Sequence, residues 1–411
     1  MRIAVVGAGV SGLVTAYLLA REHEVTVFEA GDHLGGHTHT VDVDLGAGPR
    51  PVDTGFIVFN HRTYPNFTRL LAQLGVRSQP SRMTFSVHCE RTGLEWGSQA
   101  LLAQPRNLLR PSFGRMLVDV LRFYRSAPKL LDQPGGELSV RDYVRRARLS
   151  TAFLDHFLVP LGASIWSCPP DQLLDFPVRF MLRFMHNHGM LQLVNLPTWR
   201  VIRGGSRSYI EPLTRGLGDR IRLRTPVAAI ARHPDHVELT PADGPPERYD
   251  EVVLACHSDQ ALAMLADASP VERALLGAIR YQANDVVLHT DTSILPRARR
   301  AWSSWNYFIP AQRRDRAVLS YGMNILQNID APRFACVTVN DDGRVDPDQV
   351  LRRLRYHHPV FTLDTPRVHA QHERLIRARR TSYCGAYWGF GFHEDGVSSA
   401  LAVARRFGIT L

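Results

Sequence analysis

The hydrophobic positions of the first 30 residues follow the order strand, turn, helix, strand. Residues 2–6 form a short β-branched run typical of a buried parallel strand, which leads directly into three spaced glycines, Gly7, Gly9 and Gly12. Apolar residues then recur at helical spacing over 13–20, and 24–28 is typical of a second strand that ends in an acid, Glu29. This order predicts the first strands and helix of a parallel α/β sheet.

Two later apolar stretches predict further helical structure. Within 101–131, apolar residues follow helical spacing and arginines occupy the other faces: Phe113, Met116, Leu117, Val120, Leu121 and Tyr124 against Arg115, Arg122 and Arg125. This pattern predicts an amphipathic basic helix that either packs on the protein's own core or docks on an anionic membrane surface. The stretch 176–193 is rich in Phe and Met, so it either forms a tunnel for an apolar substrate or packs as ordinary core.

The three glycines fit the G-x-G-x-x-G pattern of dinucleotide-binding proteins. Gly7 permits the tight turn, Gly9 lets backbone approach a pyrophosphate, and Gly12 lets the helix pack closely on the strand. The helix that begins near Val10 and Ser11 presents its free N–H groups to the phosphates. These five residues are therefore predicted to bind a dinucleotide.

The acid after the second strand adds to this pattern. The carboxylate of Glu29 can accept hydrogen bonds from the ribose hydroxyls of adenosine, and its charge opposes a 2′-phosphate, so NADP is disfavoured. Ala30, in the same loop, is included in the predicted cofactor site.

A second glycine pair follows in residues 29–38, and here the sequence resembles the superfamily of flavin-containing amine oxidases and phytoene desaturases. Gly35 and Gly36 would bring a second stretch of bare backbone to the pyrophosphate or flavin, which a nicotinamide site does not require. The resemblance implies that the cofactor is FAD. Members commonly carry an arginine after the pair, whereas this chain has His37, which either contacts phosphate beside Thr38 or is a surface histidine at a turn.

The resemblance extends to the second half of the chain. Val227 stands where the backbone of a relative's valine meets adenine, and the residues around 383–397 are similar to the closing flavin motif, with Gly385, Gly396 and Val397 as predicted contacts. The positive end of the following helix would stabilise negative charge on the flavin. Relatives often have an acid where Ala386 stands here; either Asp395 or Glu394 substitutes for it, or Asp395 simply lies near a helix N-cap.

The resemblance implies an α/β fold of the amine-oxidase type. A Rossmann-like FAD-binding domain would comprise residues 1–80, 200–262 and 370–411, and an inserted α+β substrate domain with a helical segment would comprise 81–199 and 263–369.

Composition and charge narrow the function and the compartment. The net charge of +10 comes almost wholly from arginine, because Lys129 is the only lysine, and no zinc-finger or RNA-binding signature accompanies it, so we expect no nucleic-acid partner. The five cysteines are scattered without a CxxC, which predicts a reducing cytoplasm and no metal site. The uncharged run at 3–20 is either a signal or anchor segment or, as its glycines favour, internal structure.

The proton-handling groups are predicted from residue type alone. Histidine, tyrosine and tuned carboxylates can exchange protons, and the candidate catalytic residues are His39, Tyr64, His188, His393 and Glu394. Many amine oxidases and their kin use a lysine near the flavin, yet Lys129 lies in the wrong region, which disfavours typical amine oxidation.

Two segments, 52–60 and 385–396, resemble the sequences of a bacterial group of FAD-binding proteins. This group is related to fatty acyl desaturases and isomerases of the furan fatty acid type. The resemblance implies desaturation or isomerisation of an unsaturated, in some cases methylated, acyl chain by hydride transfer to flavin N5. The implied partners are an apolar substrate, the inner face of the cytoplasmic membrane and a lipid methyltransferase. The alternatives are a soluble amine or small-molecule oxidase and a non-catalytic flavin-bound partner of a lipid-modifying enzyme.

Overall fold

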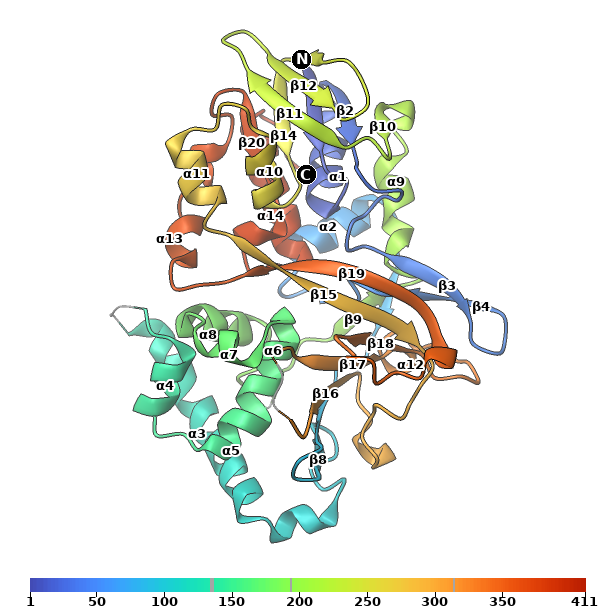
Figure 1. Cartoon of the computed structure of the whole chain (residues 1–411), viewed down its shortest axis with the longest axis vertical. Coiled ribbons are helices and arrows are strands. Elements are labelled where there is room, and N and C mark those ends of the chain that lie inside the picture. The colour runs from blue at the N-terminus through green and yellow to red at the C-terminus, as the bar shows by residue number, and fades with distance from the viewer. Residues whose placement is uncertain (134–136, 193, 313–314) are drawn as a thin grey trace.

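The computed structural model describes residues 1–133, 137–192, 194–312 and 315–411. A parallel sheet with its helices occupies one end of the molecule, a large mixed sheet lies in the middle, and a helical segment forms the other end (Figure 1). Within the described ranges, no helix is long and apolar enough to cross a lipid bilayer.

Five parallel strands form the sheet that contains the N-terminal strand, in the order β10-β2-β1-β14-β20. Their bounds are β1 (Arg2–Val6), β2 (Glu24–Phe28), β10 (Ile221–Arg222), β14 (Glu251–Leu254) and β20 (Thr381–Tyr383). These strands come from distant parts of the chain and form one Rossmann-like sheet, which confirms the predicted α/β class. The exact domain boundaries stay a prediction.

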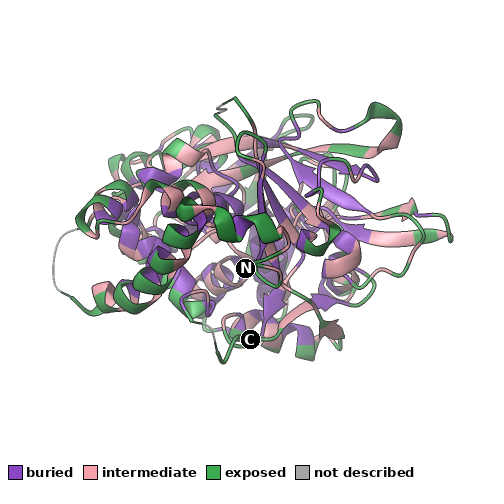
Figure 2. Ribbon diagram, turned by 90° about the horizontal axis from the view of Figure 1, so that it is seen from below, coloured by how far each residue is buried: buried purple, intermediate pink, exposed green. Residues whose placement is uncertain are grey.

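Both faces of this sheet are covered, because side chains alternate along β1: Ile3 and Val5 join one core cluster, and Ala4 and Val6 join another. The first cluster is closed by helices α1 (Val10–Leu19), α2 (Pro65–Gln73), α9 (Ile210–Thr214) and α14 (His393–Arg405). The second is closed by strands β11 (Val227–Arg232), β12 (Val237–Pro241) and β13 (Glu247–Tyr249) with helices α10 (Ser258–Met264), α11 (Pro270–Leu276) and α13 (Thr365–His369). Figure 2 shows purple, buried strands surrounded by helices that are green on the outside.

A seven-stranded mixed sheet in the order β19-β15-β18-β17-β16-β7-β8 forms the middle of the molecule. Its strands are β7 (Phe85–Cys89), β8 (Leu94–Gly97), β15 (Arg280–His289), β16 (Trp305–Ile309), β17 (Val318–Gly322), β18 (Cys336–Val339) and β19 (Val350–Val360). The long antiparallel pair β15 and β19 crosses the molecule beside the parallel-sheet end (Figure 1). Smaller elements complete this region: β3 (Thr40–Asp44) with β4 (Pro49–Asp53), β5 (Phe59–Asn60) and β6 (Ser78–Pro80) on β9 (Trp199–Ile202), and α12 (Met323–Leu326).

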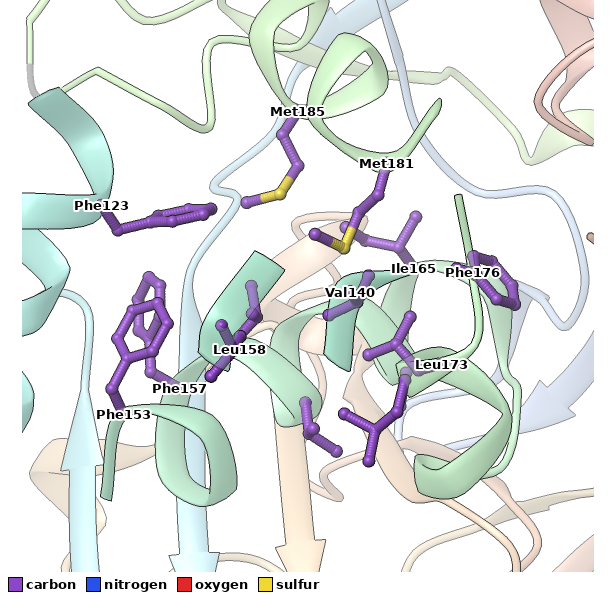
Figure 3. Packing of buried hydrophobic residues seen from close by; sticks show 14 of the residues in the cluster. Phe123, Val140, Phe153, Phe157, Leu158, Ile165, Leu173, Phe176, Met181 and Met185 are labelled. Carbon is purple, nitrogen blue, oxygen red and sulfur yellow. The ribbon is translucent and has the colours of Figure 1, made fainter. Parts of the chain in front are cut away.

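The helical segment packs on the far side of the mixed sheet. It comprises η1 (Pro105–Leu109), α3 (Pro111–Asp132), α4 (Val140–Arg146), α5 (Thr151–Phe153), η2 (Leu154–Leu158), α6 (Val159–Trp166), α7 (Pro170–Leu174) and α8 (Val178–Asn187). Its core is rich in Phe and Met; Figure 3 shows Phe123 of α3 near Met185 of α8, and Phe153 next to Phe157. Of the two alternatives for the stretch 176–193, the structure shows core packing for its Phe and Met side chains, while Leu193 lies outside the described residues.

The apolar face of α3 differs in one respect from the sequence prediction. Phe113 and Met116 are buried as expected, but Leu121 is exposed and Phe123 is buried in its place. Each residue turns the helix by about 100°, so a face centred between Met116 and Phe123 leaves Leu121 outside.

Candidate cofactor and active site

One cavity of about 690 Å³ lies where the parallel sheet meets the mixed sheet. Its first wall is made of the loops that follow β1, β2, β14 and β20, so it opens at the carboxyl ends of parallel strands. This edge is where α/β sheets bind their ligands, and the volume suits a cofactor or a ligand of comparable size.

The first turn of α1 faces this cavity. Gly9, Val10 and Ser11 line it, and a β-carbon built at Gly9 would meet no atom within 4 Å, so the space beside Gly9 is open. The unpaired N–H groups and the positive end of the helix dipole both favour an anion at this position. The geometry is that of a pyrophosphate cradle.

The two other glycines of the turn act in different ways. Gly7 lines the cavity at a φ of +102°, whereas a β-carbon at Gly12 would lie 1.9 Å from the carbonyl oxygen of Gly7. Gly12 is thus required for the close fit between helix and strand, and it does not line the cavity.

Glu29 closes the cavity beside the end of β2. Its carboxylate accepts hydrogen bonds of 2.7 Å from the backbone N–H of Ala8 and of 2.7 Å from that of Gly31. These bonds hold the side chain across the glycine turn and leave acceptor capacity on both oxygens for ribose hydroxyls. Ala30 and Val227 line the same end.

The second glycine pair lies directly against the first turn. Gly35 and Gly36 have φ angles of +109° and +58°, and a β-carbon on Gly36 would lie 3.2 Å from the Cα of Gly9. Both residues and His37 line the cavity, so His37 is not a surface histidine. Burial and neighbouring histidines hold the pKa of His37 well below its usual value, which makes it neutral before any anion binds.

The opposite end of the cavity has aromatic and aliphatic walls. They come from the loop after β4, the end of α6, the mixed sheet and the loop before α14: Phe56, Ile57, Val58, Ile165, Trp166, Trp305, Tyr321, Phe361 and Phe392. Among the described residues that line the whole cavity, Glu29 is the one Asp, Glu, Lys or Arg side chain. The described residues at its aromatic end therefore include no ionic side chain.

His393 lines the cavity beside this wall and belongs to a buried hydrogen-bond network. Its Nε2 lies 2.9 Å from Oγ1 of Thr38 and 3.1 Å from the hydroxyl oxygen of Tyr209, and its ring stacks on Phe56. Burial lowers the pKa of His393 to about 3, so the imidazole is neutral near pH 7. Thr38 acts in this network and is not itself a lining residue.

The hydrogen bonds around His358 define its tautomer. The amide oxygen of Asn284 accepts from Gln282 and Asn340, which leaves its amide nitrogen to donate to Nδ1 of His358 at 2.8 Å. Burial lowers the pKa of His358 to about 4, so near pH 7 its one proton resides on Nε2. His358 lines the cavity and can donate a hydrogen bond from Nε2 to a bound molecule.

The other predicted catalytic residues lie outside the cavity lining. His39 bonds to Tyr356, Tyr64 is buried beside α2, and Nδ1 of His188 lies 2.9 Å from the carbonyl oxygen of Phe184. Glu394 accepts bonds from the backbone N–H groups that begin α2. Their catalytic roles stay a prediction, whereas the structure brings His393 to the cavity.

The remaining predicted cofactor residues divide in the same way. Gly385 lines the cavity, while Val397 is fully buried in the core. A β-carbon on Gly396 would lie 2.7 Å from Val10, so this glycine lets α14 approach α1. Asp395 accepts a hydrogen bond from the backbone N–H of Phe392 at the start of α14, which agrees with the N-cap alternative.

Sequence reasoning did not select Trp166, Tyr321, His357 or His358, all of which line the cavity. The adjacent pair His357 and His358 could have indicated a functional site, since a strand does not require two histidines for its structure and histidine can exchange protons near pH 7.

The chain matches the sequence profile of the family described as flavin containing amine oxidoreductase over residues 10–299. The chain belongs to this family. The members of this family are flavin-containing oxidoreductases, and FAD is accordingly the cofactor of this chain. The pyrophosphate cradle, Glu29 and the open space at Gly9 fit this cofactor, and the glycines that surround them would hold its ADP half.

Relatives of this family agree in sequence or in fold. A Mycobacterium tuberculosis protein named as a flavin-containing monoamine oxidase, AofH, is 26% identical over 261 residues, which cover 60% of this chain and 54% of AofH. The flavin-dependent L-tryptophan oxidase RebO of Lentzea aerocolonigenes is 26% identical over 270 residues, which cover 59% of this chain and 54% of RebO. The chain thus spans about half the length of these curated relatives.

Solved structures show the same fold at low identity. Cyclohexylamine oxidase from Brevibacterium oxydans IH-35A superimposes with a TM-score of 0.69 at 15% identity, covering 99% of both chains. A CLA-producing fatty acid isomerase from P. acnes gives a TM-score of 0.70 at 16% identity, covering 99% of this chain and 98% of the isomerase. The amine-oxidase fold predicted from the sequence is confirmed.

Proposed function

We propose that this oxidoreductase desaturates or isomerises an unsaturated fatty acyl chain, either plain or methylated. The observation that carries the proposal is the aromatic end of the cavity, which has apolar walls and no ionic side chain among the described lining residues. An acyl chain loses no hydration energy there, whereas a charged ammonium or carboxylate would leave water without an ion partner.

The position of the single lysine supports the same proposal. Lys129 is exposed near the end of α3, and it is not a lining residue. A mechanism that depends on a lysine beside the flavin is therefore disfavoured for this chain. The shared fold does not decide between the substrates, because it serves both cyclohexylamine oxidase and a fatty acid isomerase.

The residues around the aromatic end would bind, orient and shield the substrate. When bound, FAD supplies an acceptor for a hydrogen that leaves the substrate as hydride. Trp166, Trp305 and Tyr321 would hold an apolar chain and exclude water. The Nε2 proton of His358 would donate to a polar group such as an ester carbonyl, and the neutral ring of His393 keeps positive charge out of the wall.

The first test is an anaerobic visible spectrum of the FAD-loaded protein with phospholipids that carry unsaturated or methylated acyl chains. We expect the flavin absorbance to bleach with desaturation, or the lipid product to show a shifted double bond without net bleaching in isomerisation. Amines at the same concentration are the control substrates.

The alternatives give different results in the same experiment. Bleaching with amines and an unchanged lipid pool would replace the proposal by a soluble amine or small-molecule oxidase. A flavin that neither bleaches nor changes any lipid would indicate a non-catalytic partner of a lipid-modifying enzyme, such as a lipid methyltransferase.

A further inference from the structure

One stretch of the surface concentrates exposed apolar side chains. Eleven large hydrophobic residues are exposed in the part of the chain that the structure describes, and six of them lie between 101 and 121. We call these six the leucine surface: Leu101, Leu102, Leu108, Leu109, Val118 and Leu121. Leu108 and Leu109, in η1, are 69% and 84% exposed, so they protrude from the protein. Single exposed leucines need no explanation, but six large exposed apolar side chains within residues 101–121 indicate a binding surface.

The outward face of α3 continues this surface. Phe113, Met116 and Phe123 turn inward to the core, whereas Val118, Leu121 and Arg125 follow helical spacing on the opposite side. The helix therefore has a buried apolar face and a second, exposed face that is apolar at its N-terminal half and basic beyond. Core packing accounts for the first face only.

Basic residues surround the leucine surface. The segment 98–132, which ends with α3, contains six basic side chains, Arg106, Arg110, Arg115, Arg122, Arg125 and Lys129, and two acids, Asp119 and Asp132. Asp119 is fully buried and pairs with Arg115 and Arg122, so it presents no negative charge to solvent. The exposed surface combines protruding leucines with positive charge.

We propose that the leucine surface docks this protein on an anionic lipid bilayer, with Leu108 and Leu109 inserted among the headgroups and Arg106, Arg110 and Arg125 on lipid phosphates. Amphipathic surfaces of this composition bind membranes through apolar insertion and attraction to anionic lipid. A second copy of the chain is a poor occupant, because a symmetric contact would bring the same cations face to face.

The location agrees with this role. η1 and the start of α3 lie at the bottom of the view in Figure 1, at the end of the molecule farthest from β1 and the rest of the parallel sheet. Docking there leaves the parallel sheet, and the loops at the carboxyl ends of its strands, free of lipid. The proposal does not depend on the substrate proposed above, since vesicle binding is measured without turnover.

The test is flotation of the FAD-loaded protein with vesicles of phosphatidylcholine alone or with 30% phosphatidylglycerol, at low and at high salt. We expect binding to the anionic vesicles that weakens with salt. Leu108→Ser/Leu109→Ser should lower the partition coefficient at least about ten-fold, because it removes two apolar side chains that insert into the bilayer. Arg106→Glu/Arg110→Glu should lose binding to a similar degree and with it most of the salt dependence.

The matched control is Leu223→Ser/Leu363→Ser, which removes two exposed leucines elsewhere and should bind like the wild type. Bound flavin and circular dichroism of each variant confirm folding. Absence of binding to anionic vesicles at low salt, or equal binding of the Leu108/Leu109 variant, would overturn the proposal. A dimer in solution that this variant disrupts, without lipid binding, would assign the surface to self-association instead.

Discussion

The missing side chain at Gly9 leaves open the space beside the first turn of α1. We expect Gly9→Leu to fold normally, because the first side-chain atom meets no protein atom within 4 Å, but to lose FAD, because the side chain occupies the pyrophosphate position. The flavin absorbance of the purified protein and its circular dichroism spectrum measure the two effects.

The control for this change is Gly216→Leu, at an exposed glycine where a β-carbon also meets nothing within 4 Å. That variant should keep its flavin. Tight FAD binding by Gly9→Leu would contradict the placement of the pyrophosphate beside α1.

Asp395 makes folding dependent on pH. Burial raises the pKa of this carboxyl to about 7 from an ordinary value of 3.8, so between these values the folded protein holds a proton that the unfolded chain releases. The stabilisation is complete below about pH 4 and is lost as the pH rises through 7.

We therefore expect Asp395→Asn, which cannot titrate, to gain stability relative to the wild type as the pH rises from 4 to 8. Urea unfolding of both proteins across this range measures the difference. The exposed residue change Asp219→Asn provides the control. A difference between Asp395→Asn and the wild type that is constant with pH would contradict burial of a proton at Asp395.

At the scale of elements, α14 and α2 are joined by the carboxylate of Glu394. It accepts bonds of 3.0 Å and 2.8 Å from the backbone and side-chain nitrogens of Asn66 and of 2.9 Å from the backbone N–H of Phe67. Because these groups begin α2, Glu394 acts as a helix cap supplied by another helix.

We expect Glu394→Ala to lower the free energy of unfolding by about 2 kcal/mol, since it leaves buried N–H groups unpaired. FAD affinity should change little, because Glu394 does not line the cavity. Chemical unfolding and a flavin titration give the two values. Glu211→Ala, which removes a surface ion pair with Arg215, should cost less than about 1 kcal/mol. Loss of turnover in Glu394→Ala at unchanged stability would support its predicted catalytic role.

The order of apolar, glycine and acidic residues predicts an element correctly where all the residues that determine it lie in one short segment. The strand, glycine turn, helix and acid at 2–29 form as expected, because each step depends on near neighbours in the chain. Leu121 was misplaced because the inner face of α3 is chosen by the helices it packs on, and spacing alone allowed either side.

At the scale of the whole molecule, the cavity is assembled from every layer. Gly9 comes from the parallel sheet, Trp305 and His358 from the mixed sheet, and Trp166 from the helical segment. The pairing of β15 with β19 brings His358 to the cofactor loops, and this pairing has no short-range signal. The local sequence pattern could therefore predict the ADP half of the site, but not the walls of its aromatic end.

This assembly predicts that FAD stabilises all layers together. With free FAD at 100 times its Kd, the free energy of unfolding should rise by about 2.7 kcal/mol. Tryptophan fluorescence, which reports on all six tryptophans with Trp166 and Trp305 among them, and flavin release should then show one shared transition. A tryptophan transition that does not shift with FAD concentration would mean that the helical segment and the mixed sheet unfold independently of the cofactor. Gly9→Leu, which should not bind FAD, provides the reference curve.

The single lysine of the chain offers a site for a dye that follows changes around the leucine surface. Lys129 is exposed on α3, the helix that carries part of the leucine surface. An amine-reactive dye thus has one side-chain target besides the terminal amine, and its fluorescence would respond to local polarity without an engineered cysteine. The unmodified sequence already carries its own attachment point for a spectroscopic reporter.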